Sequence, residues 1–494
     1  MDSILKPTLV LMTGRALAFG ATFVIPLVLA RVFDQGQFGT YKQLLLVFST
    51  LVAVVPLGMA ESLYYFVPGQ PRRAGRYAAN ATLFLALAGL GTAAVLAATG
   101  PRLAAALANA AAGGYIASVG VFTALMLAAA PLETIMIAGR RYRSAATTYA
   151  VSDLARAALF ALPAALTGSL AWLMAGALLF GGLRLAAGLV YLAREFGREL
   201  RPDLAALRSQ LRYALPFGAA AIVEIAQGTY HQYAVSYHFG AAAFALYSVG
   251  CLQVPLVDFI AGPAGNVAMV HMAERRGDGP AVVRLWHDTT RQLALVFVPL
   301  VVLLEVAAGD LIVALYTPLY AQSVPIFRLW CLTVLLSTLQ TDAVLRVYAR
   351  TRFILLLNLA RLALVASTIT WLLRRFGIPG AALAAVSGLA LAKVVALARL
   401  RGLLGTGLAR LLPWATLARI AAVSLAAAAP ALLVRAELEG APWARLLWVS
   451  STYTLAYAAL ALALLVTPPE RRALTGWLAR FGRPLPAEQG TVGS

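Results

Sequence analysis

Charged side chains inside long apolar runs are the residues of this sequence best suited to do chemistry. Arg15, Arg156 and Arg361 lie well inside such runs. A charge within a membrane span costs roughly 2.5 to 3.5 kcal/mol on insertion scales, so it usually faces protein or a water-filled cavity. Because a guanidinium keeps its charge on burial and offers forked donors, these arginines are suited to bind an anion. Lys42 and Arg328, near the outer ends of their runs, could extend the same cationic path.

Carboxylates inside apolar runs form a second group of candidates. Glu224 and Asp258 lie nearest the middle of their runs. A carboxyl in such a place can take up and release a proton, so either residue could bind a coupling ion. Glu133 and Asp342 lie beside basic loops and are predicted to act as structural gates.

A purely structural role is the alternative for these charges. Asp153 stands three residues before Arg156 on one helical face, so the two could form a local ion pair instead of serving as a gate and a ligand. Glu224 and Asp258 could likewise form fixed salt bridges with arginines. The sequence leaves both possibilities open.

Tyrosines near the ends of two apolar runs could contact a sugar. Tyr64, Tyr230 and Tyr233 present aromatic faces that suit sugar rings in a wet cavity. Tyrosine-rich helix ends are, however, commonly interfacial anchors. The neighbouring His231 and His238 are too far apart, and too poor in nearby carboxylates, to predict a metal site. No Walker A motif occurs either, so no cofactor is expected.

The elements that must position these residues are membrane-spanning helices. The 494 residues are 61% hydrophobic and 12% charged, with a mean hydropathy of +0.81, which is too apolar for a water-soluble protein. A helix needs about 20 apolar residues to cross the membrane. The sequence predicts an all-α polytopic protein with about fourteen spans. They lie near residues 8–31, 41–66, 78–99, 115–138, 147–167, 170–192, 213–237, 244–270, 292–315, 325–347, 353–373, 380–399, 415–434 and 445–467.

The distribution of arginines predicts the orientation. With the N-terminus inside, the inner loops and the tail carry about 24 basic residues and the outer loops about 4, a strong bias under the positive-inside rule. Both termini are therefore expected in the cytoplasm. The net charge of +20 is then mainly a signal of topology, and no nucleic-acid partner is predicted.

Several segments repeat at an offset of about 205 to 209 residues, as an internal duplication requires. HFGAAAFALYSV at 238–249 aligns with VFDQGQFGTYKQ at 32–43, and LNLARLALVA at 357–366 aligns with SDLARAALFA at 152–161. Within the segment at 32–43, DQGQFG is predicted to be a tight outer turn. Gly36 and Gly39 should permit the reversal of the chain there.

The repeat predicts two six-helix bundles that are related in parallel, because six spans return the chain to the same side of the membrane. The bundles should comprise residues 1–200 and 201–400, with a substrate site between them. Residues 401–494 should add two extra helices and a cytoplasmic tail.

PLVLARVFDQGQFGTYKQ at 26–43, VVPLGMAESLYYFVP at 54–68 and AGRRYRSAATTYAVSDLAR at 138–156 resemble the polysaccharide transporter branch of the multidrug/oligosaccharidyl-lipid/polysaccharide exporter superfamily. The resemblance implies a flippase of the bacterial inner membrane. It would move undecaprenyl-pyrophosphate-linked oligosaccharide outward for O-antigen, capsule or exopolysaccharide synthesis, by alternating access through a cationic central cavity. Membrane lipids are further expected partners, and the polymerase and chain-length proteins of the pathway are candidate ones.

Two other classes of function remain as alternatives. An ion-coupled drug or organic-cation antiporter of the same superfamily should have an acidic cavity, and the deep arginines count against it. An enzyme of the same pathway would need a sizeable outer loop with catalytic groups, but the longest outer connection, GPRLAAALANAAAGG at 100–114, has no catalytic pair. No enzymatic activity is therefore predicted. The sugar, the coupling ion and the oligomeric state stay open.

Overall fold

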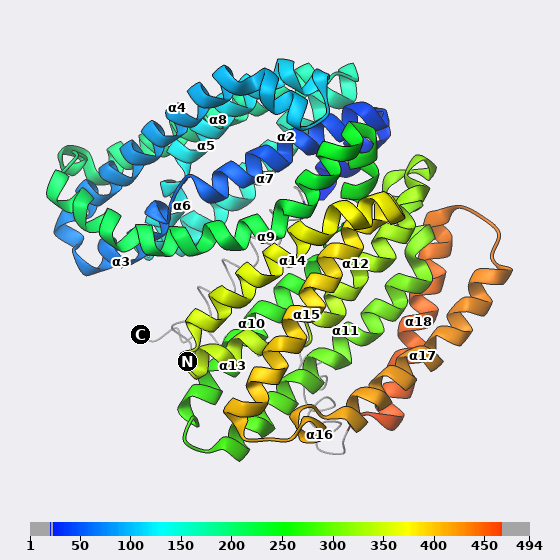
Figure 1. Cartoon of the computed structure of the whole chain (residues 1–494). Coiled ribbons are helices and arrows are strands. Elements are labelled where there is room, and N and C mark those ends of the chain that lie inside the picture. Colours follow the sequence, from blue (N-terminus) through cyan, green and yellow to red (C-terminus); the bar gives the residue numbers. More distant parts are fainter. Residues whose placement is uncertain (1–19, 21–22, 467–494) are drawn as a thin grey trace, which may run out of the picture. The chain divides into compact units, whose positions relative to one another are not determined.

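The structure is a computed structural model that describes residue 20 and residues 23–466 (Figure 1). The described part is helical and contains no strand. Twelve of its helices are long and apolar enough to cross a membrane, so the chain is a multi-pass membrane protein. Each corresponds to one of the fourteen predicted spans. The first predicted span lies mostly outside the described residues, and the seventh falls in a long helix that is too polar to be counted among the twelve.

The helices of the first half follow a short helix at Phe23–Val32. They are α2 (Gln35–Val54), α3 (Met59–Gly69), α4 (Ala74–Ala106), α5 (Gly113–Ala129), α6 (Pro131–Ala138), α7 (Tyr142–Thr167), α8 (Leu170–Phe196) and α9 (Leu204–Gly250), with the 3-10 turns η1 (Pro71–Arg73), η2 (Ala110–Ala112) and η3 (Gly197–Glu199).

The second half continues with helices of similar length. They are α10 (Pro255–Glu274), α11 (Gly279–Tyr316), α12 (Val324–Leu336), α13 (Thr341–Val347), α14 (Thr351–Phe376), α15 (Pro379–Leu404), α16 (Leu408–Leu411), α17 (Trp414–Glu437) and α18 (Pro442–Leu464), with the 3-10 turn η4 (Pro318–Ser323).

The helices pack into two compact units. Among the described residues, the first comprises those up to 253 with 312–333 and 349–396, and the second comprises 254–311, 334–348 and 397–466. In the first unit α9 packs against α2 and α14, and its core includes the fully buried Phe244 and Tyr247.

In the second unit α17 and α18 lie side by side (Figure 1). The buried carboxylate of Asp310 on α11 holds both of them, because it pairs with Arg435 at 3.1 Å and with Arg445 at 2.9 Å. One carboxylate therefore fixes the two extra helices to α11.

Left-handed backbone positions recur 209 residues apart. The pairs are Ala108 and Thr317 (φ 48° and 100°), Arg140 and Ala349 (61° and 54°), and Gly168 and Gly377 (63° each). Helices α7 and α14, which begin 209 residues apart, both have 26 residues. The backbone turns thus recur at 209 residues, close to the offsets of 205 and 206 of the two aligned sequence motifs. The bundle boundaries near 200 and 400 stay a prediction.

The turn between the first two predicted spans differs from the prediction. The chain reverses at Phe33 and Asp34, and the Asp34 carboxylate caps α2 by accepting from the N–H of Gln37 at 2.8 Å. Gly36 and Gly39 lie inside α2 and have no positive φ, so the prediction that they relax the turn is wrong. A side-chain cap replaces the expected glycine conformation.

Asp203 caps α9 outside the membrane spans. Its carboxylate accepts from the N–H groups of Ala205 and Ala206 and from Arg76 at 2.8 Å, while Asn80 pairs with its backbone. The N–H of Ala206, followed by the Arg76 guanidinium, holds the pKa of Asp203 below its ordinary value of 3.8.

A carboxyl with a lowered pKa in the folded state stabilises the fold above its unfolded pKa, and this contribution is lost as the pH falls below 3.8 towards the lowered value. We expect Asp203→Asn to lower the unfolding temperature at neutral pH and to make its decline at acidic pH shallower than in the wild type. Thermal unfolding between pH 7 and pH 3 measures both effects, and parallel pH profiles would contradict the role of this carboxylate.

Candidate substrate pocket

The candidate site depends on a close approach of α2 and α9. Gly240 interrupts α9 with a φ of 75°, and the residues after it turn alongside α2. A β-carbon on Gly39 of α2 would overlap the carbonyl oxygen of Ala241. The two backbones are therefore in direct contact, which only glycine at position 39 permits.

A buried polar network joins the two helices beside this contact. Gln43 on α2 donates to the carbonyl of Leu107 at 2.9 Å and to the hydroxyl of Ser236 on α9 at 2.7 Å. Asn109 donates to the side-chain oxygen of Gln43 at 2.6 Å and to Thr40 at 2.9 Å. Such satisfied networks rigidify a helix contact. Sequence reasoning missed these residues, although uncharged amides inside apolar spans are a usable signal.

A pocket of about 420 Å³ opens between α2 and the second half of α9, within the first unit. Lys42 of α2 lines it together with other polar side chains. They are Ser49, Gln232, Ser248 and Gln253. The remaining wall is mostly apolar and includes Pro26, Leu46 and Phe244. The pocket thus combines a cation, amides and hydroxyls with an apolar wall.

Lys42 provides the positive charge of this pocket. Its ammonium lies 5.4 Å from the ring centroid of Phe38, which is itself fully buried against Tyr316 and Tyr320. Within the described residues no carboxylate pairs with Lys42. The contact with the ring positions the ammonium, and its charge remains available to an anion in the pocket.

The other predicted cations of the described part do not line this pocket. Arg15 lies outside the described residues. Arg156 forms an ion pair with Asp153 at 2.6 Å, as the structural alternative anticipated. Arg361 on α14 is half-buried and near enough to His231 for their charges to interact, and Arg328 on α12 is exposed. Lys42 alone among the predicted cations of the described part lines the pocket.

The predicted acidic residues fall into two groups. Glu224 on α9, Asp258 on α10 and Asp342 on α13 are exposed. Glu133 on α6 is buried and pairs with Arg184 of α8 at 2.7 Å, and Arg184 also donates to Ser152. An ion pair that joins α6, α7 and α8 in this way has the geometry of a structural contact.

Of the three predicted tyrosines, two are partly buried on α9 and one is exposed on α3. The hydroxyl of Tyr233 donates to Thr50 at 2.9 Å and so links α9 to α2, while Tyr230 is partly buried and packs against the core of the first unit. Tyr64 on α3 is 45% exposed.

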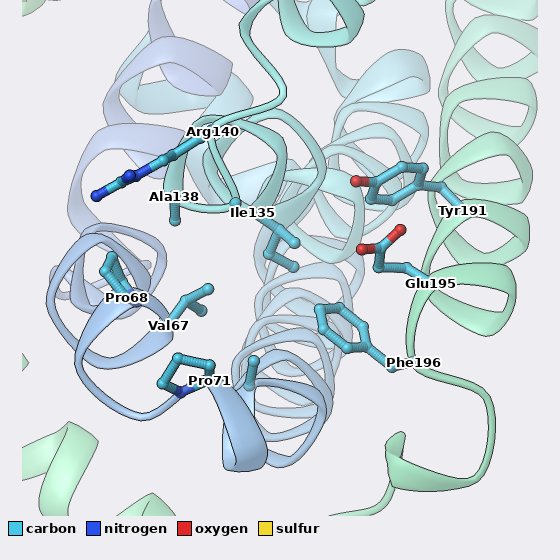
Figure 2. Close-up of a pocket in the computed structure, with 11 residues that line it drawn as sticks. Val67, Pro68, Pro71, Ile135, Ala138, Arg140, Tyr191, Glu195 and Phe196 are labelled. Carbon is cyan, nitrogen blue, oxygen red and sulfur yellow. The ribbon is translucent and has the colours of Figure 1, made fainter.

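A second cavity of about 390 Å³ lies at the ends of α3, α6 and α8, away from every predicted site residue of the described part. Figure 2 shows Tyr191 and Glu195 of α8 directed towards it. Glu195 also pairs with Arg141 at 2.6 Å, and Arg140 is the cation that lines the cavity elsewhere.

Comparison with known proteins defines the class. The fold matches transporters of the multidrug/oligosaccharidyl-lipid/polysaccharide exporter superfamily, and a family profile described as "Polysaccharide biosynthesis protein" matches residues 28–325. The chain belongs to this family of polysaccharide biosynthesis proteins, as its sequence motifs predicted. A comparison with curated proteins finds no similar sequence.

Solved structures share the fold at low identity. The lipid II flippase MurJ, in an inward closed conformation, matches with a TM-score of 0.67 and 12% identity over 91% of this chain and 100% of its own. A multidrug resistance MATE family transporter in an inward-facing conformation matches with 0.56 and 14% over 80% and 96%. A superfamily transporter from Pyrococcus furiosus, whose binding pocket is described as having reverse polarity, matches with 0.54 and 12% over 81% and 94%.

Proposed function

We propose that this protein is a flippase that moves undecaprenyl-pyrophosphate-linked oligosaccharide outward across the bacterial inner membrane for polysaccharide synthesis, with both termini in the cytoplasm. The observation that carries the proposal is Lys42. It supplies a cation with no carboxylate partner among the described residues to a pocket whose amides and hydroxyls suit a sugar and whose apolar wall suits a lipid. Membership of the polysaccharide biosynthesis family and the fold shared with a lipid II flippase support the same substrate class.

In the proposed mechanism the pyrophosphate binds to Lys42 while the polyprenyl chain stays in lipid. Arg15, Arg361 and Arg328 extend the cationic path, and the two repeats rock to expose the cavity to either side. Arg156 stays paired with Asp153 and does not bind the pyrophosphate directly, and Tyr230 contacts the sugar beside Gln232.

Charge removal at Lys42 tests the proposal directly. We expect Lys42→Gln to reduce the sided transport of a pyrophosphate-linked oligosaccharide in proteoliposomes roughly tenfold to hundredfold, because a hydrogen bond to a charged group contributes about 1.5 to 3 kcal/mol. Lys42→Arg should retain most of the transport. Equal transport by wild type and Lys42→Gln, at matched insertion, would remove Lys42 from the substrate path.

An organic-cation antiporter is the second candidate, since multidrug transporters share the fold and Glu224 is exposed on α9. A charged side chain inside the membrane avoids lipid, so an exposed Glu224 would face water and could bind a cation or a proton. Proton-coupled export of organic cations by the wild type, lost in Glu224→Gln and kept in Lys42→Gln, would establish this function in place of the flippase.

A further inference from the structure

A cavity of about 850 Å³ in the second unit has no part in the proposed transport site. One wall is the first turns of α11, with Pro280, Val283 and Arg284. The opposite wall is the connection from Leu404, the last residue of α15, to Thr416 in the first turn of α17. The cavity thus lies between helix ends within a single compact unit.

The position of these helix ends places the cavity at the level of the lipid head groups. Both α15 and α17 are long enough to span the membrane, and the chain leaves one at Leu404 and enters the other at Trp414. The Trp414 side chain is 54% exposed, and its indole N–H donates to the carbonyl of Leu408 at 3.1 Å. An exposed tryptophan with a satisfied N–H at a helix end is typical of the membrane interface.

The wall formed by the connection is held in a fixed position. Trp286 on α11 is fully buried and donates from its indole N–H to the carbonyl of Leu411 at 2.9 Å. The imidazole of His287 lies 3.0 Å from the carbonyl oxygen of Arg410 and 3.2 Å from that of Leu411. Two neighbouring residues of α11 therefore hold the backbone at Arg410, so the site is formed in advance of any ligand.

The charge of the cavity is positive. Arg284 and Arg410 line it from opposite walls, and neither forms an ion pair with any residue that the structure describes. No carboxylate lines the cavity in the described part of the chain. The hydroxyl of Thr406, which also lines it, is buried and has no hydrogen-bond partner among the described residues. Two guanidinium groups and a hydroxyl can donate to the oxygens of one phosphate.

We propose that this cavity binds an anionic phospholipid, with the phosphodiester on Arg284 and Arg410 and the glycerol and upper acyl chains on Val283, Leu404 and Leu412. The apolar part of the wall and the position at the head groups favour a lipid over a soluble phosphate. The described lining contains no carboxylate that could pair with an ammonium, and this favours an anionic head group over a zwitterionic one. The proposal is independent of the transported substrate.

The experiment titrates phosphatidylglycerol and phosphatidylethanolamine into the delipidated full-length protein and counts bound lipids by native mass spectrometry. The variants are Arg284→Gln/Arg410→Gln and, as a matched control, Arg401→Gln, which removes an exposed arginine at the same end of α15 that does not line the cavity. We expect wild type and the control to bind one phosphatidylglycerol about tenfold more tightly than phosphatidylethanolamine, and the double variant to lose this preference.

Retention of the preference by the double variant would overturn the proposal. Glycerol 3-phosphate provides a second arm: if it raises the unfolding temperature as much as phosphatidylglycerol does, the site takes a soluble phosphate and the lipid assignment is wrong. Arg410 lies on the exposed connection between α15 and α17. If the double variant does not fold, the single variant Arg410→Gln is compared with wild type for its preference for phosphatidylglycerol.

Discussion

Replacing Gly39 by alanine is expected to destabilise the protein by about 3 kcal/mol, a large effect for one methyl group. The added β-carbon would overlap the carbonyl oxygen of Ala241, and a backbone atom cannot move aside as a flexible side chain can. Relief of the overlap must separate α2 from α9, which strains the bonds of Gln43 to Ser236 and of Asn109 to Gln43. The unfolding temperature in lipid nanodiscs, measured for variant and wild type, gives the size of the effect.

Gly91→Ala is the matched control. Gly91 lies within α4, and a β-carbon there would have no atom within 4 Å. Because alanine is the better helix former by about 0.5 to 1 kcal/mol, this variant should be as stable as the wild type or slightly more so. If Gly39→Ala behaves like Gly91→Ala, the backbone contact between α2 and α9 does not contribute to the stable fold.

Glu133→Gln is expected to produce the second large loss, about 3 to 5 kcal/mol. The side chain of Glu133 is 4% exposed and that of Arg184 is 15% exposed, at a separation of 2.7 Å. The glutamine would leave the Arg184 guanidinium buried without its counter-charge, and this uncompensated charge is the main cost. Thermal unfolding of the reconstituted protein measures the loss directly.

Two further variants separate burial from ion pairing as such. Glu195→Gln breaks the pair with Arg141, whose side chain is 50% exposed, and should cost less than about 1 kcal/mol because water screens this pair. Combining Glu133→Leu with Arg184→Leu should recover much of the stability lost in Glu133→Gln, since neither charge of this pair remains buried. Equal losses in Glu133→Gln and Glu195→Gln would show that burial does not govern the effect.

Hydropathy predicted most of the fold correctly. A run of apolar residues must form a helix in lipid because every backbone group has to be satisfied within the segment, so local sequence suffices to find a span. Hydropathy did not clearly identify a membrane span in α9, because Glu224, Gln227 and Gln232 interrupt its apolar run. The cap at Asp34 was missed because the nearby glycines gave a stronger local signal for a turn.

The candidate site was less predictable because its contacts join residues distant in sequence. The pair of Asp153 and Arg156 could be anticipated, since residues three apart share a helical face. Nothing local indicated that Glu133 would meet Arg184, or that Gln43 would bond to Ser236, 193 residues away. The position of the cations within apolar runs identified them as residues inside the membrane. Only the packed structure distinguishes Lys42, which lines a pocket, from arginines that pair within the protein.

The network at Gln43 has a consequence for the speed of any movement between α2 and α9. Its bonds share atoms of the same two amides, so the loss of the Gln43 contact to Ser236 also weakens the hold of Asn109. A separation of α2 from α9 would therefore be cooperative, because the bonds break together. The free energy would rise to a single barrier along this movement. A transporter with such a barrier rests in one conformation for long dwell times and changes state in rare, complete steps.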